Sequence, residues 1–216
     1  MLKIMVFVLC SLFSSTAMAT YELNIHKVDD GVYALVGDLS QRSADNLGNN
    51  STHGVIVTDE GVILVDSGAS YLGAKQIHEA IQTLTSQPIK YVINSGGQDH
   101  RWLGNDYFQQ LGATIISSTE AKVDHQNRAD GQLMFLETLL GDSLKGTKPF
   151  FATEVFETER KLSLGGVDLE LYHFGPAHTP GDIIIWMPEK RLMFTGDVVY
   201  NNRMLGIGPA RNFQSW

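Results

Sequence analysis

Short apolar runs bounded by Gly, Asn, Asp and Ser recur along the whole chain, and three longer amphipathic segments interrupt them. This pattern is typical of short strands that alternate with helices. We expect strands at Glu22–Val28, Gly31–Gly37, His53–Thr58, Val62–Asp66, Ile89–Asn94, Ala113–Ser117, Lys161–Leu164, Val167–Phe174, Asp182–Met187 and Arg191–Thr195. We expect helices at Ser70–Leu84, Trp102–Leu111 and Glu120–Leu140, the last with a break near Gly131. Strand-rich ends around a β-α-β middle predict mixed sheets covered by helices.

The N-terminus carries the pattern of a secretory signal peptide. One basic residue, Lys3, precedes an apolar run from Ile4 to Phe13, and small residues surround a cleavage point after Ala19. The apolar run is too short to span a bilayer, which takes about 20 residues. We therefore expect residues 1–19 to be a signal peptide, residues 20–216 to form one domain, and the protein to be periplasmic or secreted. An uncleaved anchor or a buried first strand is the alternative.

Composition restricts the partners of such a domain. The single cysteine, Cys10, lies within the expected signal peptide, so the mature domain has no disulfide and depends on core burial. The formal charge is -8 and no basic run is present. An acidic chain of this kind is a poor match for nucleic acid or for an anionic membrane surface. We expect the partner to be a small-molecule substrate.

Four polar motifs stand at the ends of expected strands, where sheet-based folds place their sites. They are Asp66–Ala69 (DSGA), Gly96–His100 (GGQDH), His178–Asp182 (HTPGD) and Thr195–Asp197 (TGD). Each motif alone has an ordinary explanation, because an Asp after a strand often caps the next helix or turn. The four together predict a shared site at one edge of the sheets.

In this order and spacing the motifs resemble the metallo-β-lactamase superfamily, and the resemblance extends over most of residues 20–216. It implies an α+β fold, the αββα sandwich, in which two mixed β-sheets pack face to face with helices on the outer faces. It also implies metal ions held by loops at one edge. The stretch from Val198 to Trp216 adds no complete helix. We therefore expect the last layer to be incomplete and the C-terminal part of the domain to lie outside this sequence.

The resemblance assigns possible metal ligands residue by residue. The family signature His-x-His-x-Asp-His, aligned on its last two residues, puts Asp99 and His100 in place, while Ser95 and Gly97 replace the leading histidines. His178 matches the third histidine of the first metal site, and Asp197 matches the aspartate that commonly bridges two metals.

The first site would then be empty or very weak. Asp99, His100 and Asp197 would remain as ligands for one zinc ion at the second site, since a catalytic zinc commonly has three protein ligands. Asp66 would have a structural role.

If zinc binds, the resemblance implies a metal-dependent hydrolase acting on a small ester, thioester or amide, with β-lactams among the candidate substrates. Asp99 would orient the attacking water, and His178 would serve as general base or oxyanion partner. The alternative is a degenerate family member without a metal centre that binds a small ligand, if it has any activity.

The residues and segments around these motifs also suggest roles. Gly96 and Gly97 permit an unusual turn and, in place of two imidazoles, leave extra volume for a substrate. Arg101 could pair with a substrate carboxylate, whereas Trp102 is expected to pack in the core. The loop Asp38–Thr52 could fold over the site near His53. The Glu120–Leu140 helix would be a packing or lid element.

Overall fold

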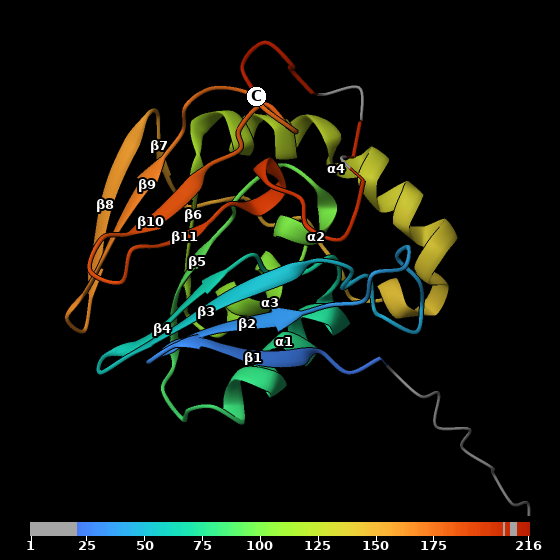
Figure 1. The fold of residues 1–216 in the computed structure, drawn as a ribbon. Coiled ribbons are helices and arrows are strands. Elements are labelled where there is room, and N and C mark those ends of the chain that lie inside the picture. Colours follow the sequence, from blue (N-terminus) through green and yellow to red (C-terminus); the bar gives the residue numbers. More distant parts are fainter. Residues whose placement is uncertain (1–20, 205, 208–210) are drawn as a thin grey trace, which may run out of the picture.

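The computed structural model describes residues 21–204, 206–207 and 211–216 (Figure 1). The expected signal peptide at residues 1–19 lies outside the described residues. Among the residues that are described, no helix has the length and apolar character that crossing a membrane requires.

A seven-stranded sheet forms the first layer of strands, in the spatial order β1-β2-β3-β4-β5-β6-β7. Its strands are β1 (Asn24–Asp29), β2 (Val32–Val36), β3 (Thr52–Thr58), β4 (Gly61–Val65), β5 (Ile89–Ile93), β6 (Thr114–Ser118) and β7 (Glu154–Phe156). Pairs from β1 to β4 are antiparallel, and pairs from β4 to β7 are parallel. The sheet is therefore mixed, because hairpins join its first strands and helical crossovers join the later ones.

A four-stranded sheet forms the second layer, in the order β11-β10-β9-β8. It contains β8 (Glu159–Leu164), β9 (Val167–Tyr172), β10 (Ile184–Met187) and β11 (Leu192–Phe194). All of its pairs are antiparallel, so only the larger sheet is mixed.

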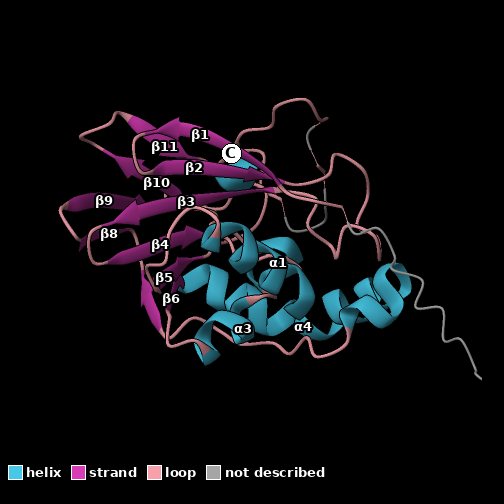
Figure 2. Cartoon of the chain, turned by 90° about the horizontal axis from the view of Figure 1, so that it is seen from below, coloured by secondary structure: helices cyan, strands magenta, loops and turns pink. Residues whose placement is uncertain are grey.

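The helices pack against the seven-stranded sheet and lie together on one side of the molecule (Figure 2). They are α1 (Tyr71–Gln82), α2 (Asp99–Trp102), α3 (Asn105–Gln110) and α4 (Thr119–Leu140), with 3-10 turns η1 (Gly141–Leu144) and η2 (Gly196–Val198). Serine side chains cap the two longer helices, because Ser70 accepts a hydrogen bond from Gly73 N and Ser118 accepts one from Ala121 N.

Two expectations about helices are wrong. The segment expected as one helix from Trp102 to Leu111 forms two short helices, and the first begins earlier, at Asp99. The chain turns at Gly104, where a Cβ atom would overlap the carbonyl oxygen of Ser67. The break expected near Gly131 is absent, since α4 runs without interruption. A single glycine costs a helix only about 1 kcal/mol relative to alanine.

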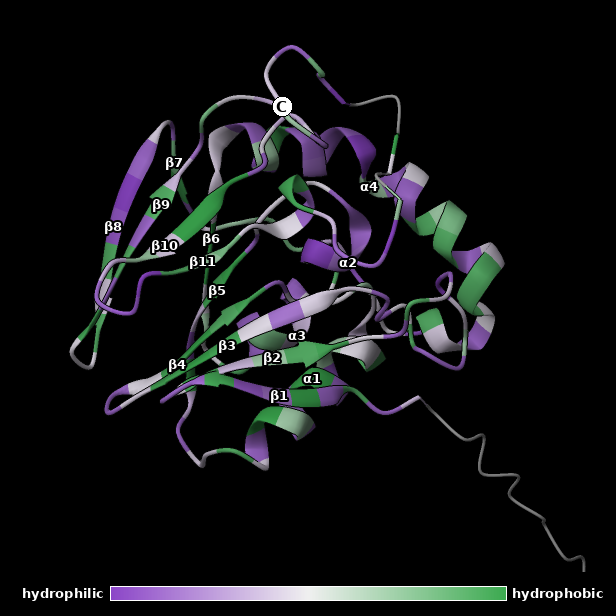
Figure 3. Cartoon of the chain, in the orientation of Figure 1, coloured by the Kyte–Doolittle hydropathy of each residue, from purple (hydrophilic) through white to green (hydrophobic). Residues whose placement is uncertain are grey.

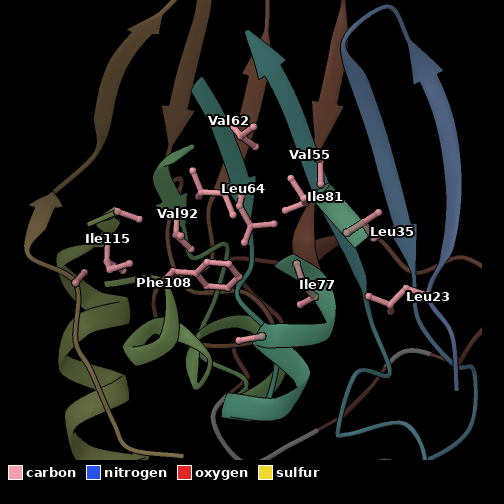
Figure 4. Close-up of a cluster of buried hydrophobic side chains, with 14 residues drawn as sticks. Leu23, Leu35, Val55, Val62, Leu64, Ile77, Ile81, Val92, Phe108 and Ile115 are labelled. Carbon is pink, nitrogen blue, oxygen red and sulfur yellow. The ribbon is translucent and has the colours of Figure 1, made fainter. Parts of the chain in front are cut away.

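Two apolar layers hold the sandwich together. One lies between the large sheet and helices α1 and α3 (Figure 4), and the other lies between the two sheets. Strand β4 is covered on both faces, and all five of its residues are buried. This explains why its sequence is apolar throughout instead of alternating, as Figure 3 shows by its colouring.

Candidate functional site

The four sequence motifs converge at one edge of the sandwich. Asp66 follows β4, His100 lies in α2 after β5, His178 lies between β9 and β10, and Asp197 lies in η2 after β11. All four side chains are buried. The motifs therefore meet at one edge, as expected, and the contacts that their side chains make there decide what the edge can do.

Arg101 binds the two carboxylates that the motifs supply. Its Nε donates to Asp197 Oδ2 at 3.1 Å, its Nη2 to Asp197 Oδ1 at 2.8 Å, and its Nη1 to Asp66 Oδ2 at 2.7 Å. Burial opposes the charge of Arg101, but Asp197 and Asp66 raise its pKa above the ordinary value. Burial likewise opposes the charge of Asp197, yet Arg101 and then His100 hold its pKa well below the ordinary value. The expectation that Arg101 is available for a substrate carboxylate is wrong, because its charge is already paired.

Asp66 fixes the backbone at this edge. Its carboxylate accepts hydrogen bonds from the backbone nitrogen of Ser95 at 2.7 Å and from the Ser95 hydroxyl at 2.8 Å. Asp66 also has a positive φ of 69°, a conformation that costs a non-glycine residue energy unless its surroundings hold it. These contacts join the loop after β4 to the loop after β5 and support the structural role expected for Asp66.

His100 lies between two acidic partners and a second arginine. Its Nε2 is 3.4 Å from Asp197 Oδ2, and its Nδ1 is 2.8 Å from Arg42 Nη2. Asp99 lies on the Nδ1 side, where its Oδ1 is 3.7 Å away and accepts a hydrogen bond from Arg42 Nε at 2.7 Å. Burial, followed by the charge of Arg42, lowers the pKa of His100 to about 4. The ring is neutral at pH 7, with Asp99 and Asp197 on opposite sides.

Side chains from α4 fill the space beside Gly97. A Cβ atom on Gly97 would overlap Asp124 Oδ2 and lie 2.7 Å from Arg128 Nη2. Arg128 Nε donates to Asp124 Oδ1 at 2.7 Å, and Arg128 Nη2 donates to the carbonyl of Gly97 at 2.8 Å. A Cβ atom on Gly96 would overlap Asp182 Oδ1. The expectation that the two glycines leave volume for a substrate is wrong, because the side chains of Asp182, Asp124 and Arg128 fill the space beside them.

His178 faces the C-terminal segment. Its ring lies 5.6 Å from the Trp216 ring at an angle of 72°, and its Nδ1 is 3.4 Å from the hydroxyl of Tyr200. Burial lowers its pKa, so the ring is neutral at pH 7. Trp216 is held in place because its indole nitrogen donates to the carbonyl of Val198 at 3.0 Å.

A cavity of about 360 Å³ opens between strands β2 and β3 on one side and β11 on the other. His53, His100 and Asp197 contribute polar groups, and Val36 and Phe194 are among the apolar residues that line it. His53 Nδ1 lies 3.0 Å from the carbonyl of Asp66, and burial lowers the pKa of His53 to about 3. His178 is not among the residues that line this cavity.

The buried side chains of Asp66, Asp99, His100, Arg101 and Asp197 form a charged cluster, called the centre. Three charged residues that contact or flank the centre carry no motif in the sequence: Arg42, Asp124 and Arg128. Arg42 comes from the polar loop before β3, in which nothing distinguishes it. Asp124 and Arg128 have the i, i+4 spacing of a helical ion pair, a signal that could have been noticed. Their position beside Gly97 depends on the docking of α4, which sequence periodicity does not give.

The arrangement does not fit the zinc ion implied by the resemblance. In the part of the chain that the structure describes, no three His, Cys, Asp or Glu side chains come together as metal ligands. Asp99 and Asp197 lie on opposite sides of His100, and an arginine binds each carboxylate. Among the described residues, the side chains that form a hydrogen bond or ion pair with Asp197 are His100 and Arg101. If the family signature His-x-His-x-Asp-His is moved one residue along the sequence, its four ligand positions fall on Gly96, Gln98, His100 and Arg101. In that alignment His100 and Arg101 stand at the Asp and the last His of the signature.

Comparison with known proteins supports the fold. A family model described as "Metallo-beta-lactamase superfamily" matches residues 48–215. The metallo-β-lactamase from Pontibacter korlensis superimposes with a TM-score of 0.71 at 20% identity, covering 90% of this chain and 81% of the other. The metallo-β-lactamase IND-7 superimposes with a TM-score of 0.69 at 17% identity, covering 90% and 80%.

Curated relatives are distant. The chain is 22% identical over 191 residues to metallo-β-lactamase type 2 of Elizabethkingia meningoseptica, with 88% of this chain and 67% of that protein covered. It is 26% identical over 160 residues to the 2,4-dinitroanisole O-demethylase subunit alpha of Nocardioides sp. strain JS1661, with 73% and 44% covered. The chain thus spans 44% to 67% of the length of these two relatives.

Proposed function

Since the chain belongs to the metallo-β-lactamase superfamily, we propose that it binds a small organic molecule in the cavity beside Asp197. The superfamily acts on small-molecule substrates, and this cavity lies at the sheet edge where the four sequence motifs meet. The proposal concerns binding, and it does not depend on whether the bound molecule is converted.

The cavity itself carries the proposal. Its volume of about 360 Å³ is within the usual range for small-molecule sites, roughly 300–1,000 Å³. Such sites combine apolar walls with a few polar groups that orient the ligand. Val36, Val65 and Phe194 supply apolar wall here, and His53 and His100 supply polar groups.

The charge state of these groups favours a ligand without a strong charge. His53 and His100 have pKa values of about 3 and about 4, so both are neutral at pH 7. Arg101 and Asp197 also line the cavity, but each neutralises the other. A largely apolar molecule with one polar function, such as an ester or an amide, matches this lining.

Hydrolysis of the bound molecule is a second candidate function. It rests on membership of a superfamily whose relatives named above include β-lactamases. Under this hypothesis the substrate is a small ester, thioester, amide or β-lactam. Asp99, His100 and Asp197 would hold one zinc ion, with His178 as a base. That assignment requires the pairs of Arg42 with Asp99 and Arg101 with Asp197 to separate, and it requires His178, which lies outside the cavity lining, to reach the bound molecule.

Two matched valine variants test the binding proposal. Val36→Phe fills the cavity from β2, whereas Val123→Phe adds the same side chain on the exposed face of α4. Isothermal titration with p-nitrophenyl acetate, an aryl thioester and nitrocefin should give at least one saturable ligand. Val36→Phe should weaken its binding at least about tenfold, equivalent to 1.4 kcal/mol, while Val123→Phe leaves it unchanged.

Analysis of the recovered ligand separates the two candidate functions. Intact ligand after prolonged incubation with and without zinc supports binding alone. Zinc-dependent product that disappears in Asp197→Asn supports the hydrolase. If none of the three compounds binds saturably, or if both valine variants weaken binding equally, the cavity is not the site.

A further inference from the structure

Arg101 is a buried cation, and each of its three guanidinium nitrogens already donates at least one hydrogen bond. Nε and Nη2 bind Asp197, and Nη1 donates both to Asp66 and to the carbonyl of Thr52 at 3.2 Å. The planar guanidinium binds the Asp197 carboxylate through two parallel hydrogen bonds, the geometry in which arginine holds carboxylates most firmly. A buried charge is tolerated only with such partners. Asp197 therefore already has a cation in direct contact.

Arg42 occupies the other side of the centre. Its Nε donates to Asp99 Oδ1 at 2.7 Å, and its Nη2 lies 2.8 Å from His100 Nδ1 and 3.1 Å from Gln98 Oε1. Asn50 Oδ1 also lies 3.0 Å from His100 Nδ1, but Arg42 is closer.

His100 has a cation close to it on each side. Its Nδ1 lies 2.8 Å from Arg42 Nη2, and its Nε2 lies 3.4 Å from Asp197 Oδ2, a carboxylate that Arg101 already binds. A metal ion between His100 and Asp197 would therefore meet the positive charge of both arginines.

The two guanidinium groups carry together the same charge as one divalent ion. They contact three carboxylates of the edge, Asp66, Asp99 and Asp197. We propose that Arg42 and Arg101 replace the metal ion of this centre: they neutralise its carboxylates and hold its loops, and zinc is not a cofactor of this chain. This inference concerns the metal alone and needs no ligand in the cavity.

The zinc content of the purified full chain is the first test. The protein is dialysed against micromolar zinc chloride, then against zinc-free buffer, and metal is measured by mass spectrometry with Tm recorded before and after EDTA. We expect less than about one zinc per ten chains and an unchanged Tm. A zinc ion at this centre would lie close to the guanidinium groups of Arg42 and Arg101, and like charges repel one another. One zinc per chain with a Tm that falls on chelation would overturn the proposal.

Removing an arginine should create affinity for zinc. Arg101→Ala leaves two buried carboxylates without a partner and could prevent folding, so Arg42→Ala is the primary variant, because Arg42 lies on a loop and its side chain is 12% exposed. We expect Arg42→Ala to lower Tm without zinc, to bind zinc at least about tenfold more tightly than the unsubstituted chain, and to recover Tm on zinc addition.

Arg160→Ala is the matched control, since it removes an arginine whose partner Glu154 lies away from the centre. It should leave zinc binding unchanged. Equal zinc affinity in Arg42→Ala and in the unsubstituted chain would show that the arginine does not exclude the metal.

Discussion

Substitution of Gly97 by alanine tests the packing of the centre. The added Cβ atom would overlap Asp124 Oδ2 and lie 2.7 Å from Arg128 Nη2. Neither side chain can retreat independently, because Arg128 bonds both to Asp124 and to the carbonyl of Gly97. Overpacking of this kind costs about 1–3 kcal/mol, and loosening the partly exposed ion pair adds up to about 1 kcal/mol.

The resulting destabilisation should be about 2–3 kcal/mol in the free energy of unfolding, measured by urea denaturation with linear extrapolation. At about 2–4 °C per kcal/mol for a chain of this size, Tm should fall by about 4–12 °C. Adding Asp124→Ala should recover part of the loss, because it removes the atom that the new Cβ meets. The double variant would then be less than additive, as contacting residues usually are.

Gly131→Ala is the control for this experiment. Its Cβ would meet nothing within 4 Å, and the residue lies inside α4. The substitution should stabilise the protein by about 0.5–1 kcal/mol through helix propensity. If Gly97→Ala proved as stable as the unsubstituted chain, Asp124 and Arg128 would not occupy the space beside Gly97, and the account of the two glycines would be wrong.

Further predictions concern pH and the core. Three buried histidines have folded-state pKa values of about 3 to about 4, well below 6.5: His53, His100 and His125. The unfolded chain therefore binds more protons between these values, so the free energy of unfolding should fall as pH drops from about 6.5 towards 4. Asp182 acts in the opposite sense, because burial raises its pKa to about 7 and its stabilising contribution is lost as pH rises from 3.8 towards 7. Asp182→Asn should thus steepen the fall, and urea midpoints that do not change across this range would contradict both assignments. Trp102→Ala should cost about 3–5 kcal/mol by urea denaturation, since the side chain is fully buried, and a cost below about 1 kcal/mol would contradict its place in the core.

Local sequence pattern was enough to predict most strands and their approximate ends. The apolar run of β4 is unambiguous because a strand between two packed layers must be apolar, and β9 alternates as a half-buried strand does. Strand β7 was missed, since it is very short and begins with a charged residue. The turn between α2 and α3 was also missed, because Gly104 is required by its approach to Ser67, a contact from a different part of the chain.

The convergence of the motifs at one edge was predicted from the sequence, and the contacts between their side chains were not. The motifs around Asp66, His178 and Asp197 are local in sequence, and the sheet edge brings them together. The partners that determine the chemistry of the centre come from elsewhere: Arg42 from a loop and Arg128 from α4. A motif of adjacent Asp and His residues predicts metal ligands equally well whether or not a distant arginine reaches them. Only the tertiary structure decides between these alternatives.

The most direct measurement of the central claim is a crystal structure of the protein grown with zinc, with anomalous diffraction recorded at the zinc absorption edge. We expect no anomalous peak beside Asp197, and electron density for the Arg101 guanidinium bound through Nε and Nη2 to the carboxylate of Asp197. A zinc peak between His100 Nε2 and Asp197, with Arg101 displaced, would contradict it.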